Sequence, residues 1–105
     1  MLNTVERLAP VEIYETQAEL GRLMANAKRI EILFHLKDGE KNVAELLELM
    51  DLSKTNLSQH LAVLRTAGIL RTRKEGSFVY YRLASEKISQ ACGLMREALT
   101  ELALA

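Results

Sequence analysis

The chain has 105 residues, of which 49% are hydrophobic and 27% are charged, and its 14 basic and 14 acidic residues give a net charge of zero. This length suits one domain with one core, and this composition excludes a disordered chain. No apolar run approaches the roughly 18 residues that a membrane-spanning helix needs, and the first residues lack the hydrophobic core of a signal peptide. The single cysteine excludes an intramolecular disulfide framework. We therefore expect a cytoplasmic protein whose fold rests on packing alone.

Charge is unevenly distributed along this neutral chain. Residues 53–82 hold six basic residues and one acidic residue, a net charge of +5, so the eight basic and thirteen acidic residues elsewhere leave −5. A positive segment on an acidic body is typical of a surface that binds phosphates. A solvated run of surface charges is the alternative interpretation.

Residues 1–10 are expected to form a flexible leader that ends at Pro10. A first helix is predicted over about 11–24, because apolar residues recur at helical spacing in VEIYETQAELGRLM. A second, central helix follows in AKRIEILFHL, where a wide apolar stripe includes Leu33 and Leu36. Asp38 and Gly39 are expected to end it, because glycine commonly follows the last turn of a helix.

Two short helices joined by a turn are predicted over about 43–67. Asn42 can cap the first helix, about 43–50, and Glu45 three positions later completes a capping box. The second helix has its N-cap at Ser53 and ends before Gly68. Two helices joined in this way form a helix-turn-helix, whose second helix reads DNA.

The hydrophobic period then changes from 3.6 to 2. Residues 69–74 alternate, residues 75–77 are typical of a turn, and residues 78–83 are rich in β-branched and aromatic side chains. This pattern predicts a basic β-hairpin, or wing, over about 69–83. Tyr80 and Tyr81 point to opposite faces of their strand, so one of them packs on the core.

A last helix is predicted over about 85–103, with Ser85 as its cap. Its apolar residues recur at spacings of four and three, which is the seam of a coiled coil and indicates a homodimer interface. The seam comprises Ile88, Cys92, Met95, Leu99 and Leu102. The first helix is expected to join this interface. Residues 11–105 are thus predicted to form one winged-helix domain for DNA binding and dimerisation, mainly α-helical with a small β-hairpin.

The helix after Ser53 has two contrasting faces. At 100 degrees per residue, Leu57, Leu61 and Leu64 form one stripe. Uncharged polar side chains suited to base edges lie on the other faces, namely Thr55 and Gln59 directly opposite, with Asn56 and Ser58 on the shoulders. His60 lies on the flank, where a phosphate contact, a packed imidazole and a base contact all remain open.

Phosphate contacts are expected from the start of this helix and from the wing. Ser53 and Lys54 occupy the N-terminal turn, where backbone N–H groups and the helix dipole favour phosphate. Arg65, Arg73 and Lys74, together with Arg71 and Arg82, would supply the salt-dependent part of DNA affinity. A solvated surface charge is the alternative for each of them.

Three strings resemble the ArsR/SmtB family of bacterial dimeric winged-helix repressors: NAKRIEILFHL, LSKTNLSQHLAVLRTAGIL and RKEGSFVYYRL. The resemblance covers roughly residues 12–102, and the middle string is its most specific part. It implies a homodimer that binds an inverted-repeat operator, with the helix after Ser53 in the major groove and the wing on phosphates. Repression is implied over activation, with release by an inducer or a metal.

The sensing sites known in that family lack their ligands in this chain. The helix over about 43–50 has no thiol, and the positions matching the second metal site are Ser85, Lys87, Ala98 and Glu101. Zinc needs three or four N, S or O ligands, so we expect no metal and no cofactor. The positions matching a dithiol switch are Phe34 and Thr100. Cys92 is either a small apolar filler or the source of an intersubunit disulfide, and the inducer is left open.

Two other classes of function fit this sequence less well. We find no nucleophile with a base, no glycine-rich phosphate loop and no paired carboxylates, so an enzyme is not expected. A winged-helix module that binds another protein is the alternative to a DNA-binding regulator. Such a module would show apolar residues where Thr55, Asn56 and Gln59 stand.

Overall fold

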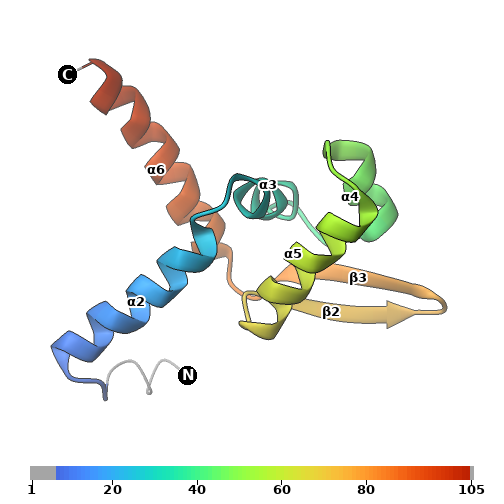
Figure 1. Ribbon diagram of the computed structural model, residues 1–105, viewed down its shortest axis with the longest axis horizontal. Coiled ribbons are helices and arrows are strands. Elements are labelled where there is room, and N and C mark those ends of the chain that lie inside the picture. Colours follow the sequence, from blue (N-terminus) through green and yellow to red (C-terminus); the bar gives the residue numbers. More distant parts are fainter. Residues whose placement is uncertain (1–6, 105) are drawn as a thin grey trace.

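A computed structural model describes residues 7–104 (Figure 1). Its elements in chain order are α2 (Pro10–Met24), α3 (Ala27–His35), β1 (Lys41–Asn42), α4 (Val43–Leu49), α5 (Lys54–Thr66), β2 (Leu70–Glu75), β3 (Phe78–Leu83) and α6 (Glu86–Leu104). The predicted winged helix-turn-helix is confirmed: a helix-turn-helix lies between two preceding helices and a hairpin, and a final helix follows. Residues 1–6 of the expected leader lie outside the described residues.

Local capping explains where the helices of the helix-turn-helix begin. The Asn42 side chain accepts from the Glu45 backbone N–H (2.9 Å), and the Glu45 carboxylate accepts from the Asn42 N–H (3.0 Å), which is the predicted capping box. Ser53 caps α5 by accepting from the Asn56 N–H (3.1 Å). Each cap satisfies a backbone donor that the helix itself leaves unpaired.

The C-terminal end of α5 is a Schellman motif. Gly68 has a positive φ of 81° and donates to the Arg65 carbonyl (3.0 Å), while Ile69 donates to the Leu64 carbonyl (3.0 Å). A side chain at Gly68 would be strained in this conformation. The glycine therefore turns the chain from α5 directly into β2, as the sequence predicts.

The end predicted for the second helix is wrong. Helix α3 ends at His35 and not beside Gly39. Lys37 donates to the Phe34 carbonyl (3.3 Å) and Gly39 to the Leu36 carbonyl (3.3 Å), so tighter i to i+3 turns replace the last helical turn. Leu36, buried to 2% exposure, is held in the core by this turn.

The sheet has a third strand, β1, that the sequence does not predict. Its order is β1-β3-β2, with Lys41 opposite Tyr81 and Asn42 opposite Tyr80. Strand β1 is two residues long, too short to show an alternating pattern, and its second residue also caps α4. The two residues directly before α4, the first helix of the helix-turn-helix, therefore form an outer strand of the wing sheet.

The hairpin turn is shorter than predicted. Glu75 pairs with Phe78 at the ends of β2 and β3, so the loop is Gly76 and Ser77 alone, and Glu75 belongs to the strand. Gly76 has a φ of 62°, the conformation that a two-residue hairpin turn of type II′ needs at its first position.

The core lies among α3, α4, α5 and the start of β2. Its buried members are Ile32, Leu33, Leu36, Leu46, Met50, Leu57, Leu61, Leu64, Ile69 and Leu70. Burying a side chain of this size stabilises the fold by about 1.5–3 kcal/mol. The three α5 leucines in this set confirm the predicted buried stripe.

Helices α2 and α6 project from this body as two diverging arms (Figure 1). The radius of gyration is 15.3 Å and the extents are 44 × 39 × 22 Å, whereas a compact domain of this size has a radius of about 13 Å. No residue of α2 is buried. The arms therefore present faces that the body of the chain does not cover.

Candidate nucleic-acid interface

The helix-turn-helix is held against α3 through its turn. Lys28 of α3 donates to the backbone carbonyl of Asp51 (2.9 Å), in the connection between α4 and α5. The Leu57, Leu61 and Leu64 side chains, all at 0% exposure, fix the inner face of α5 on the core. Because the inner face is fixed in this way, the opposite face of α5 must point towards solvent.

The outer face of α5 is polar and exposed, as predicted for a face that reads bases. Thr55, Asn56, Ser58 and Gln59 are all exposed. A shallow, open groove of about 420 Å³ runs along the helix and is lined by Lys54, Thr55, Ser58, Gln59 and Ala62. The structure thus brings the predicted base-reading side chains together on one surface.

His60 takes part in a contact that sequence reasoning did not foresee. The Arg29 Nε of α3 donates to His60 Nδ1 (3.3 Å), and Arg29 Nη1 lies 3.5 Å from the carbonyl oxygen of Leu23 at the end of α2. An imidazole that accepts at Nδ1 carries its proton on Nε2. Of the three open roles, the geometry favours the packed, hydrogen-bonded imidazole.

The two faces of the wing differ. Arg73 pairs with Tyr80 and Thr72 with Tyr81 across the hairpin, and Tyr81 packs against the core. Tyr80 therefore lies on the outer face, where the Arg73 guanidinium is 4.8 Å from its ring centroid. This settles which tyrosine faces inwards.

Arg73 is engaged with two carboxylates. Its Nε and Nη2 donate to Glu40, with a distance of 3.2 Å for Nε, and its Nη1 donates to Glu75 (2.9 Å). The hydrogen bonds from Arg73 lower the pKa of the Glu40 carboxyl below its ordinary value, although desolvation opposes them. The same bonds raise the pKa of Arg73. The pairing with Glu75 could have been predicted from the sequence, because residues two apart lie on the same face of a strand. Glu40 comes next to Arg73 only because β1 pairs with β3.

The other predicted phosphate contacts are exposed cations. Lys54 stands in the first turn of α5, Arg65 in its last turn, and Lys74 on β2 opposite Val79. None of the three pairs with a carboxylate within the part of the chain that the structure describes. Arg71 and Arg82 face each other across the hairpin, so like charges accumulate on this outer face. Ser53 is exposed but its oxygen already caps α5.

The predicted dimer seam divides into two parts. Ile88 and Cys92 pack against the core of the same chain, because the first turns of α6 lie against α3. Met95, Leu99 and Leu102 are 71%, 65% and 72% exposed, because α6 continues beyond the body. Half-buried Cys92 thus fits the filler interpretation.

The first arm exposes apolar side chains in the same way. Val11 and Tyr14 of α2 are 63% and 68% exposed, and Leu20 is 38% exposed. Large apolar surfaces left in water usually mark sites of association. The two arms are the places where the predicted interface would lie.

No group of three or more His, Cys, Asp or Glu side chains that could hold a metal ion occurs among residues 7–104. Within the same range, no helix combines the length and the apolar character needed to cross a bilayer.

A helix-turn-helix with a basic wing and a polar outer helix face defines a winged-helix DNA-binding regulator. A model of the family described as "bacterial regulatory protein, arsR family" matches residues 26–72. The transcriptional activator HlyU of Vibrio cholerae is 39% identical over 93 residues, which cover 83% of this chain and 86% of that protein. The chain belongs to the arsR family of bacterial regulatory proteins, which are transcriptional regulators and not enzymes.

Two other similar proteins differ in the share of their length that this chain covers. The HTH-type transcriptional regulator KmtR of Mycobacterium tuberculosis is 42% identical over 72 residues, or 69% of this chain, and the chain spans only 55% of its length. The solution structure of the homodimeric winged helix-turn-helix DNA-binding domain Mb0332 of Mycobacterium bovis has a TM-score of 0.76. It is 26% identical, and the match covers 92% of both chains.

Proposed function

We propose that the chain is a homodimeric, sequence-specific transcriptional repressor that acts on DNA in the cytoplasm. In each half-site of an inverted-repeat operator, α5 enters the major groove and the wing lies on the phosphate backbone. The observation that carries this proposal is the outer face of α5, where Thr55, Ser58 and Gln59 form an exposed, uncharged polar surface opposite a fully buried leucine stripe.

Short polar side chains suit base reading for a physical reason. Gln and Asn can pair bidentately with adenine, and Ser and Thr can donate to or accept from either base type. Acidic side chains would repel the phosphates, and the α5 sequence KTNLSQHLAVLRT contains none. The exposed cations Lys54 and Arg65 of α5 and Lys74 of the wing would supply affinity that is independent of sequence.

The rival interpretation, a module that binds another protein, is not favoured by this surface. Its groove exposes no apolar side chain larger than that of Ala62 among the five residues that line it. Protein interfaces are built around larger apolar and aromatic anchors.

The dimer is proposed from the two arms. Leu99 and Leu102 of α6 and Tyr14 of α2 present apolar surface, and a second copy of the chain would cover it. The homodimeric Mb0332 domain, whose structure matches most of this chain, supports that arrangement. Two copies of α5 related by a two-fold axis require operator half-sites about one helical turn apart, or a multiple of it.

Selection of binding sites from a random DNA pool tests the proposal. We expect enrichment of an inverted repeat whose half-site centres are about 10–10.5 base pairs apart or a multiple of that distance. A reporter gene placed behind the selected operator should then be repressed when the chain is expressed. Failure to enrich any sequence over the starting pool would contradict specific DNA binding, and activation of the reporter would contradict repression.

A further inference from the structure

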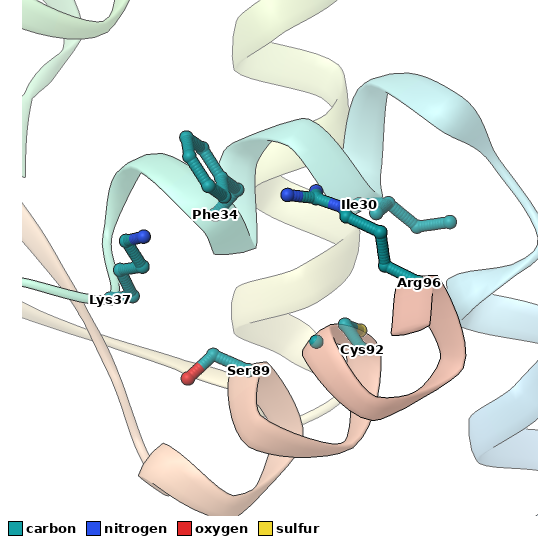
Figure 2. Close-up of a pocket in the computed structure, with 7 residues that line it drawn as sticks. Ile30, Phe34, Lys37, Ser89, Cys92 and Arg96 are labelled. Carbon is teal, nitrogen blue, oxygen red and sulfur yellow. The ribbon is translucent and has the colours of Figure 1, made fainter. Parts of the chain in front are cut away.

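A cavity of about 110 Å³ lies between α3 and α6 (Figure 2). Ile30 and Phe34 of α3 and Cys92 of α6 give it an apolar wall. Gly93 and the polar side chains of Lys37, Ser89 and Arg96 line the rest of it. A space of this size holds several water molecules, so it can take a small organic molecule.

Two cations from different parts of the chain approach one aromatic ring at this cavity. Lys37 Nζ lies 4.2 Å from the Phe34 ring centroid, and Arg96 Cζ lies 5.0 Å from it. Figure 2 shows the Phe34 ring between the ends of the two side chains. Both residues are exposed, so their long side chains can move towards a ligand.

The positive charge at the cavity is not neutralised by the chain itself. Neither Lys37 nor Arg96 pairs with a carboxylate among the residues that the structure describes, whereas Lys28 on the same α3 pairs with Glu31. Two like charges held near one ring repel each other. A negative group within reach of both side chains would be attracted by both.

We propose that this cavity binds a small organic monoanion with a carboxylate group. The carboxylate accepts two parallel hydrogen bonds from the guanidinium fork of Arg96, and the flexible Lys37 side chain turns from the Phe34 ring towards it. The apolar body of the ligand lies against Ile30 and Phe34. An inorganic anion would leave this apolar wall uncovered.

Ser89 adds little to the recognition of the anion. Its hydroxyl already donates to the backbone carbonyl of Glu86 (2.9 Å), so it has no proton to give to a carboxylate. Selectivity for a negative charge therefore rests on Lys37 and Arg96, one beyond the end of α3 and the other on α6.

A ligand here would bridge the reading unit and an arm. Helix α3 contacts α5 through the Arg29–His60 hydrogen bond, while α6 carries exposed Leu99 and Leu102 beyond the cavity. Binding that favours one angle between α3 and α6 would change the separation of the two reading helices in a dimer, and so the operator affinity. This last step rests on the proposed function, whereas the binding site does not.

A nuclear magnetic resonance titration of the full chain with benzoate, in the absence of DNA, tests the site. We expect saturable shifts of the backbone amides of Lys37, Ser89 and Arg96. Benzamide, which has the same shape without the charge, should not produce them. Arg96→Gln and Lys37→Gln should each weaken benzoate binding by about tenfold, because each removes a charge-assisted hydrogen bond.

Arg71→Gln on the wing is the matched control. It removes one positive charge from a residue that does not line the cavity and should leave benzoate binding unchanged. The site is wrong if benzoate shifts do not saturate, if benzamide binds equally well, or if Arg71→Gln weakens binding as much as Arg96→Gln. Spectra of each variant without ligand show whether it is folded. Operator affinity with and without benzoate then tests the coupling alone, and an unchanged value would refute the coupling while leaving the site.

Discussion

Glu40 accepts two hydrogen bonds from Arg73, which joins the loop before α4 to the wing. The guanidinium that the sequence assigns to phosphate binding is therefore already paired with a carboxylate, and with Glu75 as well. DNA phosphates must compete with these carboxylates for Arg73. Such exposed ion pairs contribute little to stability, so a DNA duplex can displace Glu40 and Glu75 from Arg73.

Removal of this competitor should strengthen DNA binding. Glu40→Gln is expected to raise affinity for all sequences by up to about fivefold, the equivalent of one exposed ion pair. Fluorescence anisotropy with operator and random duplexes measures it. Glu48→Gln on α4 is the matched control, because Glu48 is exposed and forms no ion pair with any described residue. An equal gain in both variants would mean that total charge alone is responsible.

The same pair gives a pH dependence of stability. Because hydrogen bonds from Arg73 lower the pKa of Glu40 in the folded chain, ionised Glu40 stabilises the fold above the ordinary carboxyl pKa of 4.5. That contribution is lost as pH falls through the lowered value. Urea unfolding should therefore show wild type more stable than Glu40→Gln at neutral pH, with the difference shrinking below pH 4.5. A difference that stays constant with pH would show that ionisation of Glu40 does not matter.

Gln59 is expected to read a base. Gln59→Ala should weaken operator binding by about 1–3 kcal/mol and relax the preference at one or two positions of each half-site. Binding to random DNA should stay nearly constant. Gln90→Ala on α6 is the matched control and should change neither affinity. Equal losses on operator and random DNA would remove Gln59 from the base-reading set.

Lys74 is expected to act on phosphate only. Lys74→Ala should weaken binding to all sequences alike and lower the slope of log affinity against log salt by about one unit. The measurement is a salt titration of operator and random duplexes. Lys87→Ala, at the start of α6, should leave the slope unchanged. A sequence-dependent loss for Lys74→Ala would contradict the phosphate role.

The exposed end of α6 is expected to form the dimer. Leu99→Glu should raise the dimer dissociation constant by about 100-fold or more, because a charge replaces apolar contact in both copies. Sedimentation velocity over a concentration series measures this constant. Leu49→Glu is the control, since Leu49 is 48% exposed on α4, away from both arms. A Leu99→Glu chain that remains dimeric would place the interface elsewhere.

The caps and turns of this fold could be predicted because they depend on neighbours in sequence. Asn42 and Glu45 are three residues apart, and so are Ser53 and Asn56, so helical geometry alone brings them together. The leucine stripe of α5 is similarly local. These local features were enough to predict the helix-turn-helix and the side of α5 that faces outwards.

Contacts between distant segments could not be predicted. Glu40 and Arg73 are 33 residues apart, and Arg29 and His60 are 31 apart. Their meeting depends on β1 and on the packing of α3 against α5. The division of the α6 seam into a packed part and an exposed part could not be predicted for the same reason. Helical spacing shows that Cys92 shares a face with Leu99, but not where the body of the chain ends.

Asn42 belongs to two elements at once, since it pairs with Tyr80 in the wing sheet and caps α4. A wing that swung independently towards DNA would have to break that strand pairing or uncap the helix. We therefore expect wing and helix-turn-helix to dock as one rigid body, with no internal hinge. A dimer could then adjust to different operator spacings only by bending where α2 and α6 connect to this rigid body. The range of half-site spacings that the dimer can bind would therefore depend on α2 and α6, and not on the helices that contact DNA.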